Sequence, residues 1–212
     1  MDLPPVSAVA DVLAMWGYDG WLTPPLHTLV APATAVLARA TTLRVELAES
    51  GPAMNPIYDV LSGDLTGRAV VIAGASGLGG AMWGEILSTA AAASHAAGLL
   101  LDGSARDVEA MVAIGMPAYA RDRCVVGPRG RAHVVAVEGP VDIGGVHLDP
   151  DDLVLLDESG CLRIPAAVAE EALDASRRYA VAEESVIEAL HHGAPLTEAY
   201  RLKKKVVDQL RR

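Results

Sequence analysis

The chain has 212 residues and a formal net charge of −10, with 51 % hydrophobic and 21 % charged residues. This composition is typical of a globular protein and excludes an intrinsically disordered one. The acidic balance argues against nucleic acid and against an anionic membrane as partners, because both bind basic surfaces. With two cysteines, no signal-peptide pattern and no charge-free apolar run of about 18 residues, we expect a reduced, cytoplasmic protein without a membrane span.

The first third of the chain alternates helical and strand patterns. Apolar residues recur at helical spacing over 6–16, where Ser7 could cap the helix. Residues 41–47 alternate with the period of a strand, and a short helical run at 57–61 precedes an apolar strand at 68–73. The segment before residue 41 fits neither pattern clearly.

A glycine-rich turn follows strand 68–73 and precedes a helix predicted over 84–97. Such a turn can hold a pyrophosphate at the helix N-terminus, and Asp102 stands where a ribose-binding acid would. However, Gly74, Gly77 and Gly79 do not have the G-x-G-x-x-G spacing, and a negative Glu85 in the first helical turn would repel a diphosphate. We therefore favour a close-packing turn and keep an NAD(P)-dependent oxidoreductase as the less favoured alternative.

The rest of the chain is β-rich and then helical. We expect Gly98 to end the helix at 84–97, a strand at 99–102, a helix at 107–114 closed by Gly115, and a strand at 116–120. Short strands separated by turns follow at 132–137, 141–143, 146–148, 153–156 and 161–164. Pro165 opens a long helix that reaches about residue 192, and a second helix follows Pro195.

Charged residues cluster at two of the predicted strand-to-helix turns. Glu85 opens helix 84–97, and Arg106 and Asp107 stand where helix 107–114 begins. In a parallel strand–helix–strand unit, helix starts lie at one edge of the sheet, so Glu85 and Asp107 can converge. Arg106 suits a substrate carboxylate and Asp107 a hard cation. Considered alone, Asp107 is more simply an N-cap worth ~1 kcal/mol, and Arg106 is more simply part of a surface ion pair. Considered together, the residues support a metal and carboxylate site as well as they support these structural roles.

Four segments carry a family resemblance. They are Trp-Gly-Glu-Ile-Leu at 83–87, Asp-Gly-Ser-Ala-Arg-Asp at 102–107, Pro-Ala-Tyr-Ala-Arg at 117–121, and the stretch from 141 to 160. All resemble the RraA-like family, which includes the 4-hydroxy-4-methyl-2-oxoglutarate/4-carboxy-4-hydroxy-2-oxoadipate aldolases and the regulator of ribonuclease E activity A. The resemblance covers roughly residues 26–165.

The resemblance implies an α/β architecture and an assembly. We expect a swivelling β/β/α domain over residues 1–165 with a C-terminal helical extension over 166–212. The family implies a homotrimer, or a hexamer of two trimers, with active sites between subunits. In the aldolase members a divalent metal, Mg²⁺ or Mn²⁺, binds the 2-keto acid pyruvate.

The resemblance also implies roles for individual residues. Asp107 resembles the direct metal ligand, Glu85 the acid that holds metal-bound water, and Arg106 the arginine that binds substrate oxygen. The backbone amides of Gly84, Glu85, Ile86 and Leu87 would hold the pyruvate carboxylate, which agrees with anion binding at a helix N-terminus.

A further acid comes from the C-terminal region of a neighbouring subunit in the aldolase members. Glu183 or Glu184 lies at about the matching place, and the sequence does not choose between them. The chain departs from the family pattern where a lysine region is usual, because it carries Arg129 and Arg131 there. This difference bears on the identity of the substrate.

The expected function is a metal-dependent pyruvate aldolase that cleaves 4-hydroxy-2-oxo acids through an enolate and decarboxylates oxaloacetate. The alternative is a non-catalytic regulator that binds a protein partner through its acidic surface. The acidic C-terminal helix favours the aldolase, because the regulators lack the C-terminal acid.

Overall fold

One large sheet forms the centre of the molecule. The computed structural model describes residues 2–47, 54–128 and 132–211, and within them nine strands form this sheet. The strands are β1 (His27–Val30), β2 (Val36–Leu47), β3 (Arg68–Ala73), β4 (Ala81–Trp83), β5 (Gly98–Ala105), β6 (Ala118–Arg123), β7 (Ala132–Val137), β10 (Leu153–Asp157) and β11 (Gly160–Ile164). Their order is β1-β6-β5-β3-β2-β10-β11, with β4 beside β5 and β7 beside β2.

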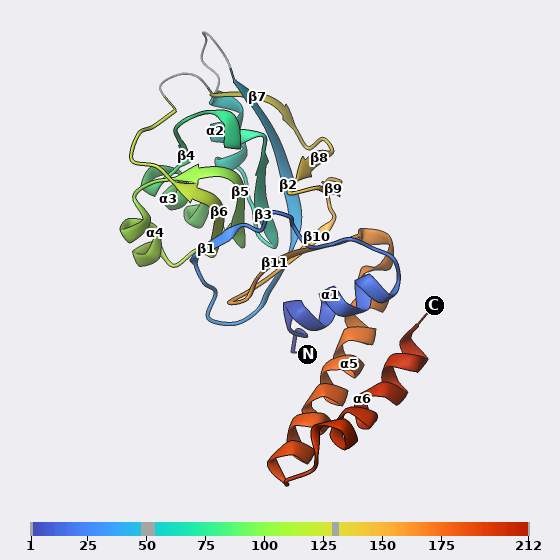
Figure 1. The fold of residues 1–212 in the computed structure, drawn as a ribbon. Helices are drawn as coiled ribbons and strands as arrows, with labels where there is room; N and C mark the ends of the chain where they lie inside the picture. The colour runs from blue at the N-terminus through green and yellow to red at the C-terminus, as the bar shows by residue number, and fades with distance from the viewer. Residues whose placement is uncertain (1, 48–53, 129–131, 212) are drawn as a thin grey trace.

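Helices and one small hairpin pack on the sheet, and the C-terminal helices extend beyond it (Figure 1). The helices are α1 (Val6–Met15), α2 (Asn55–Leu61), α3 (Glu85–Ala93), α4 (Val108–Ile114), α5 (Ala169–His191) and α6 (Leu196–Leu210), with 3₁₀ turns η1 (Ala75–Gly77) and η2 (Ala166–Val168). Strands β8 (Val141–Ile143) and β9 (Val146–Leu148) form a separate antiparallel pair. Among the residues described, none of these helices combines the length and the hydropathy needed to cross a bilayer.

The central strands are buried on both faces, which explains their uninterrupted apolar sequences. In β3, Val70 and Ile72 pack into the cluster that contains Ile57 of α2 and Met111 of α4. The alternate residue Val71 packs on the opposite face, in the cluster that holds the β8–β9 hairpin. The layers are therefore hairpin, sheet and helices, which is the β/β/α arrangement within the predicted α/β class.

The strands in the middle of the sheet are parallel. Strand β3 pairs in parallel with β2 and β5, and β5 pairs in parallel with β4 and β6. The carboxyl ends of β4 and β5 consequently lie side by side, and α3 and α4 both begin at that edge.

The helices at the two ends of the chain pack together beside the edge strand β11. Helix α1 packs against β11 and α5, and the indole Nε1 of Trp16 donates a hydrogen bond to the Leu210 carbonyl of α6 at 2.7 Å. Figure 1 shows α5 and α6 as a hairpin that extends away from the sheet. The predicted C-terminal helices are present, and the N-terminal helix packs with them.

Two predicted helix boundaries are wrong. Ser7 does not cap α1; the amide of Val6 instead donates to the Asp157 carboxylate at 2.9 Å, from β10. Helix α3 ends at Ala93, and Gly98 is the first residue of β5. A Cβ at Gly98 would lie 2.8 Å from Leu156 Cδ1, so close strand packing, and not helix capping, requires glycine there.

The turn at residues 74–80 also differs from the prediction. It contains η1 and leads into β4, a three-residue strand that the sequence pattern does not indicate, and α3 begins only after β4. Strand β2 begins at Val36, so the segment before residue 41 is part of the same strand.

Candidate active site

Two neighbouring strand-to-helix turns build the site. Strand β4 leads through Gly84 into α3, and β5 leads through Arg106 and Asp107 into α4. Trp83 is paired with Ala105 across the two parallel strands, and the Arg106 amide donates to the Trp83 carbonyl at 2.9 Å. The two turns are thus held together by backbone hydrogen bonding.

Arg106 and Asp107 pack directly on the start of α3. The Nε atom of Arg106 lies 3.5 Å from Asp107 Oδ2, and the Glu85 amide lies 3.5 Å from the same oxygen. A Cβ at Gly84 would lie 2.7 Å from Asp107 Oδ2 and 3.0 Å from Arg106 Cγ. The absence of a side chain at Gly84 is therefore what allows the carboxylate and the guanidinium to approach the helix.

The backbone of Asp107 has an uncommon conformation. Its φ is 54° and its ψ is 39°, in the left-handed region that non-glycine residues seldom adopt, and its side chain makes no capping hydrogen bond to α4. The N-cap interpretation is therefore wrong for its side chain. The conformation directs the carboxylate toward Gly84 and Arg106, where it is 43 % exposed.

A buried side-chain hydrogen bond holds the start of α3 in place. The indole Nε1 of buried Trp83 donates to the Ser88 hydroxyl at 2.7 Å, which joins the end of β4 to the first turn of the helix. The Ser88 amide bonds to the Gly84 carbonyl at 3.0 Å, so the amides of residues 85–87 precede the first intrahelical bond. A helix start of this kind could bind an anion, and the Glu85 amide already faces Asp107 Oδ2 at 3.5 Å.

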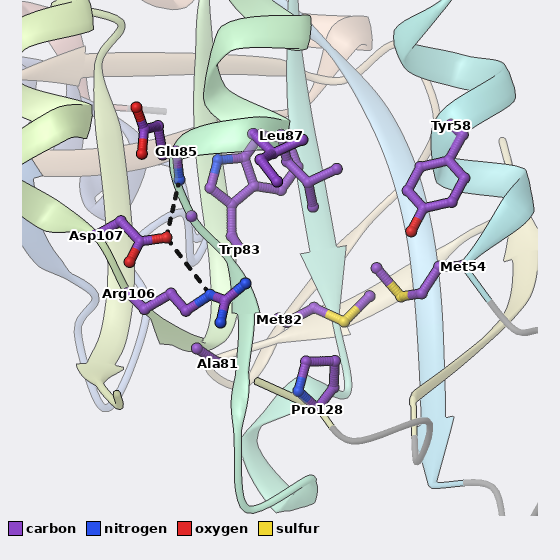
Figure 2. Close-up of a pocket in the computed structure, with 12 residues that line it drawn as sticks. Met54, Tyr58, Ala81, Met82, Trp83, Glu85, Leu87, Arg106, Asp107 and Pro128 are labelled. Atoms are coloured by element: carbon purple, nitrogen blue, oxygen red, sulfur yellow. Dashed lines mark hydrogen bonds and ion pairs between the residues drawn. The ribbon is translucent and has the colours of Figure 1, made fainter. Parts of the chain in front are cut away.

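A cavity of about 240 Å³ lies over these two turns. Six of the predicted site residues line it: Gly84, Glu85, Ile86, Leu87, Arg106 and Asp107. The remaining lining residues are Met54, Tyr58, Ala81, Met82, Trp83 and Pro128. Figure 2 shows Asp107 and Glu85 at one end of the cavity, with the Arg106 guanidinium extending toward Met82 and Pro128.

Several lining residues were not foreseen from the sequence. Met54 and Tyr58 arrive from α2 and Pro128 from the loop after β6, so they are distant in sequence from the charged residues. Met82 directly precedes the Trp-Gly-Glu segment, and that adjacency is the one signal that could have indicated it. Arg129 and Arg131 lie outside the described residues.

The charged groups present fit a divalent cation. No group of three or more His, Cys, Asp or Glu side chains occurs in the described ranges, so a closed metal cage is absent from them. Mg²⁺ and Mn²⁺ need no such cage, since one or two carboxylates with water and substrate oxygens suffice. Asp107 and Glu85 provide two carboxylates at the cavity.

The two C-terminal glutamates differ in their surroundings. Glu183 accepts an ion pair from Lys203 of α6 at 2.6 Å, whereas Glu184 is exposed. Neither lines the cavity of its own chain, and the α5–α6 hairpin that carries them points away from the sheet (Figure 1). A role in a neighbouring subunit stays a prediction.

The geometry does not support the dinucleotide alternative. The glycine turn at 74–80 contains η1 and leads into strand β4, so it does not lead directly into the N-terminus of α3, where a pyrophosphate would bind. A Cβ at Gly74 would lie 2.3 Å from the Val45 carbonyl oxygen. Close packing against β2 is the structural reason for that glycine.

Solved structures with the same fold cover most of the chain. An uncharacterized protein of Pseudomonas syringae pv. tomato superposes with a TM-score of 0.78 at 28 % identity, covering 93 % of this chain and 92 % of that one. A Streptomyces coelicolor protein, described as an unusual member of the RNase ES inhibitor RraA family, superposes with a TM-score of 0.74 at 23 % identity. That alignment covers 84 % of this chain and 88 % of the Streptomyces chain, and it supports the fold alone.

Two further proteins are related in sequence. A Halalkalibacterium halodurans protein with the provisional name 4-hydroxy-4-methyl-2-oxoglutarate aldolase is 24 % identical over 165 residues, which are 78 % of this chain and 76 % of that protein. Protein DlpA of Legionella pneumophila is 25 % identical over 118 residues, 56 % of this chain, and the match spans only 19 % of DlpA.

The family model described as RraA-like, Aldolase/RraA, matches residues 6–163. This range holds the whole sheet except the end of β11, together with both strand-to-helix turns of the site. The chain therefore belongs to the RraA-like family, which includes aldolases.

Proposed function

We propose that the protein is a divalent-metal-dependent pyruvate lyase that cleaves 4-hydroxy-2-oxo acids and decarboxylates oxaloacetate. The observation that carries the proposal is the convergence of Glu85, Arg106, Asp107 and the α3 N-terminus at one cavity. The provisional name of the Halalkalibacterium relative supports the same reaction class.

Substrate binding follows from the anion-binding groups. The amides of residues 85–87 would receive the carboxylate of the keto acid, because the helix N-terminus carries a partial positive charge. Arg106 lies beside them and can donate two hydrogen bonds to a carboxylate or to a developing oxyanion. The substrate is thereby oriented with its 2-keto end toward Asp107.

Asp107 and Glu85 would hold the cation. When bound, such a cation supplies Lewis-acid stabilisation of negative charge at the keto oxygen. Asp107 pairs with Arg106, whose Nε lies 3.5 Å from Asp107 Oδ2. Glu85 is exposed and can relay a proton through water at the open side of the cavity.

The chemical step breaks one carbon–carbon bond. The 4-hydroxyl loses its proton toward Glu85 by way of water, and the C3–C4 bond breaks as C4 becomes a carbonyl. The bonding electrons form the enolate of pyruvate, and a proton returned to C3 completes the product. Oxaloacetate gives the same enolate when its C3–C4 bond breaks and CO₂ leaves.

Pyruvate release tests the proposal. The assay would follow pyruvate from oxaloacetate and from 4-hydroxy-4-methyl-2-oxoglutarate, with Mg²⁺ or Mn²⁺ and after chelation. We expect metal-dependent release from both compounds. Rates at background for both, in folded and metal-supplemented protein, would contradict the proposal and leave the non-catalytic binding role as the better account.

A further inference from the structure

A largely buried ion pair precedes the candidate site along β5, the strand that leads to Arg106 and Asp107. We propose that Asp102 and Arg121, which form this pair, are positioning residues that hold the end of β5 in the register that the site requires. The inference rests on the proposed function and deepens it, because it concerns the same site. Neither side chain is among the described residues that line the cavity, so neither would touch the substrate.

The ion pair joins β5 to β6 at the point where the pairing of the two strands changes register. The pairing is regular up to Leu101 and resumes at Ser104, so Asp102 and Gly103 of β5 together stand opposite Arg121 of β6. Two residues opposite one form a β-bulge, which re-aims a strand and is common beside active sites. The bulge therefore lies directly before the residues that carry the site.

Specific contacts hold the bulge in place. The Nε atom of Arg121 donates to Asp102 Oδ1 at 2.6 Å, and the two side chains are only 16 % and 14 % exposed, so both charges are largely removed from water. The same guanidinium donates to the carbonyl oxygen of Pro24, which ties the loop before β1 to the pair. A Cβ at Gly103 would lie 2.6 Å from Ala75 Cβ, so this close approach to η1 requires glycine.

The register beyond the bulge sets where the site residues emerge from the sheet. In this register Ala105 is paired with Trp83 of β4, and the Arg106 amide donates to the Trp83 carbonyl at 2.9 Å. A slip of one residue would move the end of β5 by roughly 3.3 Å. That displacement is comparable to the 3.5 Å between Arg106 Nε and Asp107 Oδ2. Since an error of about 1 Å in a site can lower a rate roughly 100-fold, the register has to be fixed.

An ion pair is better suited to this task than two apolar side chains. Its net contribution to stability is small, because both charges lose water on burial. Apolar side chains could pack in either register, whereas a slipped register would leave the Asp102 carboxylate and the Arg121 guanidinium buried without partners. An unpaired buried charge is strongly unfavourable, so the pair selects one register over the other.

Two variants remove the pair in different ways. Asp102→Asn keeps the shape and removes one charge, whereas Asp102→Leu/Arg121→Met replaces both charges by apolar side chains, a change that buried ion pairs often tolerate without loss of stability. Asp152→Asn is the matched control. Asp152 pairs with Arg163 at 2.7 Å, and the two side chains are 5 % and 16 % exposed. Asp152 directly precedes β10, which β2 and β3 separate from β5 in the sheet.

Oxalate binding in the presence of Mn²⁺ measures the placement of Arg106 and Asp107 without turnover. Calorimetric titration would be run at a temperature where thermal melts show every variant to be folded. We expect both Asp102 variants to bind oxalate at least about tenfold more weakly than the wild type. The control should bind as the wild type does. Unchanged binding by both Asp102 variants, or an equal loss in the control, would overturn the inference and leave the proposed lyase intact.

Hydrogen–deuterium exchange gives a reading that does not depend on the proposed function. The amides of residues 104–107 follow the bulge, and their exchange should be at least about tenfold faster in both Asp102 variants but unchanged in the control. If the wild type binds no oxalate with Mn²⁺, the lyase proposal fails and the exchange rates alone decide the positioning role. Wild-type exchange at 104–107 in both Asp102 variants would show that the pair does not hold the end of β5.

Discussion

Asp107 combines an uncommon backbone conformation with a side chain that contributes no cap to its own helix. Residues with short polar side chains, Asn among them, tolerate the left-handed region best. Asp107→Asn should therefore change the free energy of unfolding by less than about 0.5 kcal/mol. The same variant should lose at least about 100-fold in pyruvate release, because it removes the charge that would hold the cation.

Urea denaturation and the oxaloacetate assay, run on one preparation, check both parts of this prediction. A variant that retains full activity would remove Asp107 from the proposed mechanism. A variant that unfolds much more readily would show that the carboxylate stabilises the turn instead.

Gly84 is the second residue on which the site depends. Gly84→Ala would place a Cβ 2.7 Å from Asp107 Oδ2, so the carboxylate and Arg106 would have to move. We expect a loss of stability of about 1–3 kcal/mol and a severe loss of activity. Gly77→Ala is the matched control, since nothing lies within 4 Å of its Cβ position. Equal behaviour of the two variants in thermal melts and assays would contradict this reading of Gly84.

The charged residues of the site could be predicted from the sequence, whereas the apolar residues from α2 could not. Arg106 and Asp107 are adjacent, and Glu85 opens the helix before them, so the rule for parallel units places all three at one edge. Met54 and Tyr58 reach the cavity only because α2 packs on the sheet next to α3. No local pattern records a contact of that kind.

Among the elements, the α5–α6 hairpin is joined by a polar group of residues. Lys203 is buried, pairs with Glu183 at 2.6 Å, and lies 4.1 Å from the centre of the Tyr179 ring. The Tyr179 hydroxyl donates to Asp11 of α1, so three helices are linked. Burial alone would lower the pKa of Lys203, but the hydrogen bonds to Glu183 and Tyr179 outweigh it and raise the pKa.

Removing the buried ammonium should weaken the hairpin. Lys203→Met should lower the free energy of unfolding by about 1–2 kcal/mol, because the ion pair and the cation–π contact are lost together. Lys204→Met removes an exposed i,i+4 pair with Asp208 and should cost less than about 0.5 kcal/mol. Denaturant titration of the two variants measures the difference, and equal costs would show that the buried group is not stabilising.

The same group predicts a loss of stability in alkali. Burial, with a smaller contribution from Asp11, raises the pKa of Tyr179 to about 12, and the pKa of Lys203 is also raised. Because both groups hold their protons more tightly when folded, their contribution is complete below about pH 10 and declines as the pH rises above that value.

Thermal melts between pH 8 and 11 test this prediction. The melting temperature of the wild type should fall above about pH 10. A double variant, Tyr179→Phe with Lys203→Met, should start lower and fall less steeply. Parallel curves for the two proteins would rule out a contribution from this group.

Elements were predictable where local pattern and tertiary environment agree. Strands β3 and β7 have the predicted bounds, since apolar runs and alternation reflect burial on two faces or one. Strand β4 was missed because three residues carry no period, and the end of α3 was misplaced because the packing of Gly98 against Leu156 is non-local.

At the scale of the whole molecule, several large apolar side chains are exposed in the single chain. They include Ile86 at the cavity, 77 % exposed, and Val181 and Ile187 on the α5 helix, 60 % and 54 % exposed. We expect these surfaces to be covered in a homotrimer or a hexamer of two trimers. Light scattering during gel filtration should give a mass that is a multiple of three chains; a monomer across the micromolar range would contradict this.

The assembled molecule also distinguishes the two C-terminal glutamates. Glu183 is engaged by Lys203 within its own chain, which leaves the exposed Glu184 available to a neighbouring subunit. Glu184→Gln should therefore lower kcat/KM without changing the melting temperature, and Glu183→Gln should lower the melting temperature. The reverse pattern would assign the interface role to Glu183.

Joint binding of a cation and a keto-acid analogue at Asp107 tests the central claim most directly. Calorimetric titration of oxalate, with and without Mn²⁺, into the wild-type protein and the Asp107→Asn variant measures it. We predict tight oxalate binding by the wild type only with Mn²⁺, and none by the variant under either condition. Oxalate binding that is indifferent to Mn²⁺, or equal in the two proteins, would contradict the account.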